Sequence, residues 1–265
     1  RLHTSAEEVA ALEDADLPLY TILVPLYHEE NVATQLVRNL GALDYPADKL
    51  DIKLLLEADD ATTRETLERT DLPGHMQVVV VPDGQPRTKP RACNHGLLAA
   101  RGELCVIFDA EDRPEPDQLK RAVAAFRKAD PRCACIQASL RHHNAEQNLL
   151  TRWFAIEYDT TFQLVLPGLA FLRIPMPLGG TSNHFRIEVL RDVAGWDPFN
   201  VTEDCDLGVR LYRAGYHTRM FDSTTWEEAN TRLWNWIRQR SRWVKGYFQT
   251  HLVHSRSRAR TLREL

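Results

Sequence analysis

The chain has 265 residues, is 43% hydrophobic and 26% charged, and carries a net charge of −4. It is long enough for one large α/β domain or two small ones, and its overall charge neither favours nor opposes nucleic-acid binding. No signal peptide is recognisable and no apolar run is long enough to span a bilayer. The five cysteines have no repeated spacing, which argues against a disulfide framework and a zinc site.

Strand and helix patterns alternate through the first half of the chain. Short apolar runs predict strands over residues 20–24, 53–56, 77–81, 104–108 and 134–138, with Pro25 ending the first. Between them, apolar residues at helical spacing predict helices over residues 29–40, 62–68, 92–100 and 117–128. Continuous apolar strands separated by helices indicate a mostly parallel sheet covered on both faces.

The second half has a different pattern. Residues 148–164 are aromatic and apolar, and residues 178–183 read as a loop. Helices are predicted over residues 187–193, 204–214 and 231–251. From Arg232 to Arg263 the chain carries arginines and a lysine but no acid.

Acidic residues follow two of the predicted strands directly. Asp59 and Asp60 come after one strand, and Asp109, Glu111 and Asp112 after another. Ligands of parallel sheets bind beyond the carboxyl ends of the strands, so these acids are expected to converge at one rim. Hard carboxylate oxygens suit Mg²⁺ or Mn²⁺ held together with substrate phosphates. The alternative is a solvated acidic loop that caps the next helix.

The first strand is followed by residues 25–30, which contain no glycine. A dinucleotide-binding fold would show a glycine-rich fingerprint at this point, and no P-loop is present elsewhere. The sequence therefore does not predict either of these two phosphate-binding loops.

Two helices carry further candidate groups. Thr202 can cap a helix whose first turn holds Glu203 and Asp204, which suits the helix dipole without any function. Alternatively, a carboxylate there accepts a proton from a sugar hydroxyl. On the long basic helix, Arg242 can bind phosphate oxygens and Trp243 can stack on a sugar. An amphipathic basic helix on a membrane surface or along nucleic acid is the other interpretation.

Read in order, these pieces form a set of motifs. They are Ile22-Leu23-Val24-Pro25 with Glu29, Asp59-Asp60, Thr88-Lys89-Pro90 with Asn94, Asp109-Ala110-Glu111-Asp112, Gly179-Gly180-Thr181, Thr202-Glu203-Asp204 and Gln239-x-x-Arg242-Trp243. The set resembles a family 2 glycosyltransferase with the GT-A fold, closest to the processive, membrane-embedded branch that includes cellulose synthases. The resemblance covers about residues 20–250, and the ordered combination is more specific than any single motif.

The resemblance implies a role for each motif. Asp204 would be the general base on the acceptor hydroxyl, and a single displacement would invert the anomeric configuration. The implied nucleotide-binding residues are Pro25, Glu29, Asp59, Asp60, Lys89, Asp109, Gln239 and Arg242. The implied acceptor-binding residues are Glu203, Trp243, Gly180 and Thr181.

The metal motif departs from the family pattern. The usual Asp-x-Asp is Asp-Ala-Glu-Asp here, so Mg²⁺ or Mn²⁺ would bind Asp109 together with Glu111 or Asp112. Both choices for the second acid stay open.

The resemblance also implies an organisation and a location. The chain is expected to be one catalytic domain with a nucleotide-sugar-binding half (about 18–145), an acceptor-binding half (about 146–250) and a basic juxtamembrane tail (251–265). Its partners would be a nucleotide-sugar donor, a glycan acceptor and a membrane, and no nucleic acid is expected to bind.

The chain is expected to be a soluble domain cut from a longer protein at the cytoplasmic face of the inner membrane, whose transmembrane helices it lacks. The apolar residues 163–178 would lie on that membrane or pack in the core. The donor is expected to be UDP-linked and the acceptor a growing glycan. The alternatives are a non-processive transferase to a lipid or small glycan, and a catalytically silent nucleotide-binding module of an envelope complex.

Overall fold

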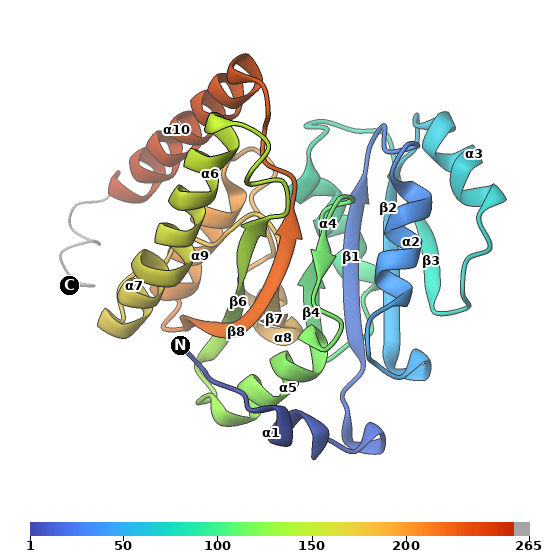
Figure 1. Ribbon diagram of the computed structural model, residues 1–265, viewed down its shortest axis with the longest axis horizontal. Helices are drawn as coiled ribbons and strands as arrows, with labels where there is room; N and C mark the ends of the chain where they lie inside the picture. Colours follow the sequence, from blue (N-terminus) through green and yellow to red (C-terminus); the bar gives the residue numbers. More distant parts are fainter. Residues whose placement is uncertain (257–265) are drawn as a thin grey trace.

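The computed structural model describes residues 1–256 as one α/β domain built on an eight-stranded sheet (Figure 1). The strand order is β3-β2-β1-β4-β7-β6-β8-β5. The strands are β1 (Tyr20–Leu26), β2 (Leu50–Glu57), β3 (Met76–Val81), β4 (Leu104–Ile107), β5 (Arg113–Pro114), β6 (Cys133–His142), β7 (Asn183–Arg186) and β8 (His217–Glu227). Only β7 and β5 run antiparallel to their neighbours. The predicted mostly parallel sheet is confirmed.

Helices cover both faces of the sheet. They are α1 (Ala6–Ala10), α2 (Ala33–Gly41), α3 (Ala61–Arg69), α4 (Lys89–Ala99), α5 (Gln118–Lys128), α6 (Leu149–Thr160), α7 (Leu166–Leu172), α8 (Ile187–Asp192), α9 (Glu203–Arg213) and α10 (Leu233–Ser255), and a π-helical turn (Thr161–Val165) joins α6 to α7. Residues of α2, α3 and α5 belong to one apolar core, and residues of α4, α7, α8 and α9 to a second. The sheet therefore separates two cores, as continuous apolar strands require.

The first strand is longer than predicted, because Pro25 lies inside β1 and does not end it. The carbonyl of Leu23 accepts a hydrogen bond from the amide of Phe108. The backbone N–H and C=O groups of odd-numbered residues in β1 therefore point towards β4. The pairing of β1 with β4 ends at Leu23. Pro25 therefore lacks its N–H where no ladder bond would be made, which is where a strand tolerates proline.

The sequence pattern missed β7 and β8, and it started two helices at the wrong residue. β8 carries His217, Thr218 and other polar residues, and its pairing with β6 buries several of them. The helix predicted from residue 29 begins at Ala33, and the helix predicted from residue 92 begins at Lys89. Pro90 in the first turn of α4 marks that earlier start, since its missing N–H costs nothing there.

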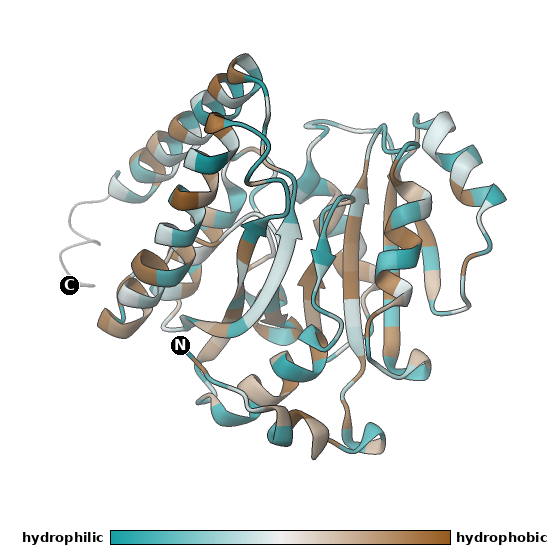
Figure 2. Cartoon of the chain, in the orientation of Figure 1, coloured by the Kyte–Doolittle hydropathy of each residue, from teal (hydrophilic) through white to brown (hydrophobic). Residues whose placement is uncertain are grey.

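The helices α6, α7 and α10 lie on one side of the molecule (Figure 1), and hydrophobic residues recur along them (Figure 2). Exposed residues on this side include Trp153, Ile156, Phe171, Trp234 and Phe248. Leu166, Ala170 and Met176 are buried, so residues 163–178 pack partly in the core and partly face solvent.

Within residues 1–256, no helix combines the length and the apolarity needed to cross a membrane. The predicted tail begins inside α10, and its residues 257–265, with Arg258, Arg260 and Arg263, lie outside the described part of the chain.

Candidate active site

A cavity of about 300 Å³ opens at the carboxyl end of β1, between the start of α4 and the loop after β4. Its lining residues are Pro25, Leu26, Tyr27, Glu29, Glu57, Arg87, Thr88, Lys89, Ala92, Asp109, Ala110 and Glu111. The strand ends and the helix start thus bring together four of the predicted nucleotide-binding residues, Pro25, Glu29, Lys89 and Asp109. This is the edge at which parallel sheets bind ligands.

Lys89 joins the cavity to the loop that precedes β7. Its Nζ pairs with the carboxylate of Asp109 and donates a hydrogen bond of 2.8 Å to the carbonyl of Gly180. Burial alone would lower the pKa of Lys89, but the attraction of Asp109 and Glu203 outweighs it and raises that pKa. Lys89 is therefore a fixed positive charge among the carboxylates.

The two candidates for the second metal-binding acid lie in different environments. Glu111 lines the cavity, where partial desolvation and the charge of Asp109 raise the pKa of its carboxyl group. Asp112 is buried, and its Oδ2 accepts hydrogen bonds from the amide of Asp109 at 2.7 Å and from the hydroxyl of Thr181. Burial, with Asp109 nearby, raises the pKa of Asp112 to about 8. Asp112 thus holds the loop from beneath while Glu111 faces the cavity.

Asp59 and Asp60 do not line the cavity. Asp60 is buried, caps α3 by accepting from the amide of Thr63 at 3.1 Å, and accepts from the amide of His28 at 2.6 Å. Burial would raise the pKa of Asp60, yet these hydrogen bonds hold it below its ordinary value. Asp59 pairs at 2.6 Å with Arg87, whose guanidinium lies over the ring of Tyr27. Asp60 therefore shapes the turn after β1, and Asp59 lies at the cavity rim.

Glu203 and Asp204 form the first turn of α9, next to the Gly179–Thr181 loop. A Cβ atom on Gly180 would lie 3.6 Å from Oδ2 of Asp204, so the loop and this carboxylate face one another. Burial raises the pKa of Asp204 to about 6, and burial with the charge of Asp204 raises that of Glu203 to about 7. Neighbouring carboxylates of this kind share their protons and titrate as a pair.

The Gln-x-x-Arg-Trp segment lies on α10. Gln239 accepts a hydrogen bond of 3.0 Å from Asn230, and Arg242 is exposed with no hydrogen bond or ion pair in residues 1–256. Trp243 is half-buried beside Arg240, whose guanidinium lies 4.3 Å from the ring centroid. Arg240 also forms two 2.6 Å contacts with Glu157 of α6. Arg240 thereby fixes Trp243 and joins α10 to α6.

Sequence reasoning missed several groups at this site. Arg87 precedes the Thr88-Lys89 motif by one residue, and Arg240 lies inside the basic helix segment, but neither carries a pattern of its own. Glu227 ends the unpredicted strand β8, and burial together with the charges of Asp112 and Asp109 raises its pKa well above the ordinary value. Glu227 could have been placed near the acidic loop only if β8 had been predicted as a strand of the sheet.

The donor set fits a divalent cation that a ligand helps to hold. Among residues 1–256, no group of three metal-ligating side chains is assembled. Asp109 and Glu111 supply two carboxylates at the cavity, and Mg²⁺ is commonly bound by one or two carboxylates, waters and substrate phosphates. The site therefore suits a cation that arrives with a phosphorylated ligand.

A family model described as "Glycosyltransferase like family 2" matches residues 18–246. The chain is 29% identical over 237 residues to the probable glycosyltransferase YdaM of Bacillus subtilis, covering 87% of this chain and 56% of that protein. It is 27% identical over 212 residues to glucomannan 4-beta-mannosyltransferase 2 of Arabidopsis thaliana, covering 77% and 40%. The chain thus spans about half the length of these curated relatives.

The fold is similar to that of the mannosyltransferase PcManGT from Pyrobaculum calidifontis, whose structure contains GDP-Man and Mn²⁺. The TM-score is 0.74 at 23% sequence identity, and the match covers 93% of this chain and 67% of the other. At this identity the likeness shows the fold alone, and the GT-A architecture expected from the sequence is confirmed. Because the family model matches most of its length, this chain belongs to glycosyltransferase family 2.

Proposed function

We propose that this chain is the catalytic domain of an inverting hexosyltransferase that uses a nucleoside diphosphate sugar, UDP-linked, and a growing glycan. The observation that carries the proposal is the contact of Lys89 with both Asp109 and the Gly180 carbonyl. It joins the cavity suited to a diphosphate to the loop that faces Asp204. A donor bound at the first and an acceptor bound at the second would then meet at this junction.

The residues would divide the work as follows. Pro25 and Glu29 line the donor cavity, and Lys89 supplies positive charge for the phosphates. Arg242, exposed and unpaired within residues 1–256, grips the diphosphate with Gln239 beside it. Asp59 lies at the rim, where it can meet the base or ribose, and Asp60 supports the turn of the cavity wall.

Asp204 takes the proton from the acceptor hydroxyl as the glycosidic bond of the donor breaks. Its raised pKa, about 6, makes it a stronger base than an ordinary aspartate and leaves it ionised near neutral pH. The acceptor would lie between Trp243, Glu203 and the Gly180–Thr181 loop. One displacement without a protein nucleophile inverts the anomeric configuration.

Asp109 and Glu111 would hold Mg²⁺ or Mn²⁺, and the buried Asp112 supports their loop. When bound, the cation neutralises the charge that develops on the leaving diphosphate. PcManGT, the structure with the similar fold, holds Mn²⁺ with GDP-Man, which supports a divalent cation here.

The membrane-associated, processive branch remains part of the proposal. The exposed apolar side chains of α6, α7 and α10 support a location at the cytoplasmic face of the plasma membrane, reached through segments outside this chain. The glucomannan mannosyltransferase among the relatives supports a polysaccharide product. The proposal keeps a nucleotide-sugar-binding half up to about residue 145 and an acceptor-binding half after it. The residues that line the cavity all belong to the first half.

Calorimetry with UDP and with GDP, in Mg²⁺, Mn²⁺ or EDTA, tests the donor site. We expect UDP to bind more tightly with the cation than in EDTA, and Asp109→Asn to remove that difference. Asp71→Asn, on the exposed loop after α3, is the matched control and should bind as the parent does. Equal affinity with and without the cation contradicts the metal site, and preference for GDP contradicts the UDP donor.

A transfer assay tests the reaction. The full chain should transfer sugar from a nucleotide sugar to a glycan with inversion, as read from the anomeric configuration of the product. Nucleotide binding without any transfer or hydrolysis would favour the silent module instead, and transfer to lipid alone would favour the non-processive enzyme.

A further inference from the structure

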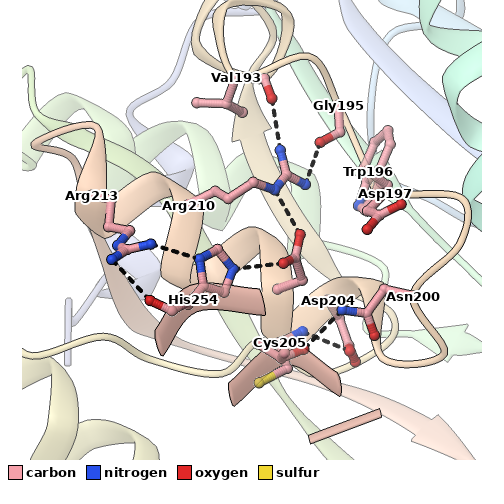
Figure 3. A network of polar contacts seen from close by, with 12 residues as sticks. Val193, Gly195, Trp196, Asp197, Asn200, Asp204, Cys205, Arg210, Arg213 and His254 are labelled. Atoms are coloured by element: carbon pink, nitrogen blue, oxygen red, sulfur yellow. Dashed lines mark hydrogen bonds and ion pairs between the residues drawn. The ribbon is translucent and has the colours of Figure 1, made fainter. Parts of the chain in front are cut away.

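A buried carboxylate connects the helix of the proposed base to the far end of α10 (Figure 3). Asp206 lies two residues after Asp204 on α9 and is 2% exposed. Its Oδ2 accepts from Nε of Arg210 at 2.7 Å, and its Oδ1 lies 2.7 Å from Nε2 of His254. His254 is the penultimate residue of α10. The last turn of α10 is therefore bonded to the first half of α9.

The partners of His254 determine which ring nitrogen carries the proton. A guanidinium nitrogen of Arg213 lies 3.0 Å from Nδ1, and the other donates to the His254 carbonyl at 3.2 Å. A guanidinium can only donate, so Nδ1 accepts and Nε2 carries the hydrogen that Asp206 accepts. The contact is thus directional, from Arg213 to His254 to Asp206.

The same face of α10 packs on the segment before the base. A Cβ atom on Gly246 would lie 2.5 Å from the side chain of Thr202, and Thr250 accepts a 2.9 Å hydrogen bond from Asn200. Residues 246, 250 and 254 follow one another at four-residue spacing, as in a ridge of a helix surface. Arg242 comes four residues earlier and starts that ridge. The seating of this ridge on α9 therefore sets where Arg242 points.

Asp206 is also tied to the donor side of the molecule. Arg210 donates to the carbonyls of Val193 and Gly195, both at 2.7 Å, while it holds Asp206. The next residue, Trp196, exchanges two backbone hydrogen bonds with the side chain of Asn94 on α4. α4 begins at Lys89. Asp206 is thus anchored on the scaffold that carries the donor cavity.

We infer that His254 is a positioning residue: through Asp206 it seats α10 on α9 and so aims Arg242 at the donor diphosphate. This inference rests on the proposed function, because Arg242 acts on the diphosphate only in that proposal. His254 itself touches neither ligand. Its role is to hold the helix that carries Arg242 in register with the helix that carries Asp204.

A double-mutant cycle on UDP affinity tests the inference in the full chain. His254→Phe keeps a ring and removes both hydrogen bonds, whereas His254→Gln can still donate to Asp206 and accept from Arg213. We expect His254→Phe to weaken UDP binding about tenfold and His254→Gln to restore most of it. In an Arg242→Ala background, His254→Phe should add less than about a twofold loss, because residues that act through one contact are not additive.

Two results would overturn the inference. One is unchanged UDP affinity in folded His254→Phe, and the other is an equal loss in both backgrounds, which indicates general destabilisation. If the parent chain binds neither UDP nor GDP, the proposed function fails. Amide hydrogen exchange without ligand then tests whether His254 holds α10 on α9. His254→Phe should then raise exchange along α10 and at residues 202–204 but not along α2, and an even increase over all helices would contradict the role.

Discussion

The donor cavity and the α10 face hold their charged groups in different ways. At the cavity, Lys89 pairs with Asp109 and Arg87 pairs with Asp59. On α10, Arg242 is exposed and has no partner in residues 1–256. Paired groups keep their geometry before a ligand arrives, whereas an unpaired arginine is free to bind one. The charged groups of the cavity are therefore preorganised, and Arg242 of α10 is available to bind an anion.

The two regions also differ in what they expose. The strands beneath the cavity are buried, while α6, α7 and α10 expose apolar residues such as Phe171 and Phe248. Arg240 of α10 pairs with Glu157 of α6 and lies against the ring of Trp243. Substitutions at the cavity and substitutions on α6, α7 and α10 should therefore impair different properties of the protein.

The largest effect is expected at the junction of the two regions. Asp204→Asn keeps the shape of the side chain and loses proton acceptance, so transfer should fall about a hundredfold or more. UDP affinity, measured by calorimetry, should change little because Asp204 does not line the donor cavity. An active variant would contradict its role as the base. Loss of UDP binding would instead assign Asp204 to the nucleotide site.

Substitutions on α10 should affect nucleotide binding and acceptor binding separately. Arg242→Ala should weaken UDP binding by about 1.5–3 kcal/mol, the usual loss for a hydrogen bond to a charged group. Trp243→Ala should spare UDP affinity and raise the KM of the acceptor, because stacking acts on the sugar. If both variants bind UDP as the parent does and lose binding to anionic vesicles together, the helix only rests on lipid.

The packing of α10 on α9 predicts a stability effect. Gly246→Ala places a Cβ atom 2.8 Å from the backbone nitrogen of Thr202, which cannot give way as a flexible side chain can. The free energy of unfolding should fall by about 1–3 kcal/mol, as for other overpacked sites. Gly41→Ala, at the end of α2 with nothing within 4 Å, is the matched control and should not destabilise the chain. Denaturant unfolding of both variants makes the comparison.

The smallest expected effect is the pH dependence of transfer. The pKa of Asp204 is raised to about 6, and only its ionised form accepts a proton. Transfer should therefore be highest above about pH 7 and fall as the pH drops through about 6, because protons then bind the pair of Asp204 and Glu203. The pH profile of kcat/KM measures this, with the pH dependence of UDP affinity as its control. A flat profile down to pH 5 would contradict the base assignment.

Much of the fold followed from the sequence because local and tertiary preferences agree there. Strands β1, β2 and β4 each contain a short apolar run and are buried almost throughout, and such a run is recognisable without its neighbours. β8 was missed because its polar residues are satisfied only by distant partners, such as Gln118, which donates to Thr225. Pairing across the sheet, not local propensity, makes this segment a strand.

For the candidate site, the sequence by itself determined which acids and bases stand at strand ends and helix starts. Lys89, Asp109 and Asp204 were named from their order along the chain, and their roles remain predictions. Tertiary structure alone decided which of the adjacent acids faces the cavity. Glu111 and Asp112 differ by one position, and the buried hydrogen bonds of Asp112 to Asp109 and Thr181 turn it inward.

Tertiary structure likewise decided that Asp60 accepts a hydrogen bond from the amide of His28 and that His254 reaches Asp206. Neither contact has a signature in the sequence, because each depends on where a segment 32 or 48 residues away comes to lie. The physical reason is that a carboxylate's role depends on its burial and its donors. Residue type and spacing fix the chemistry that is available, and packing selects which groups meet a ligand.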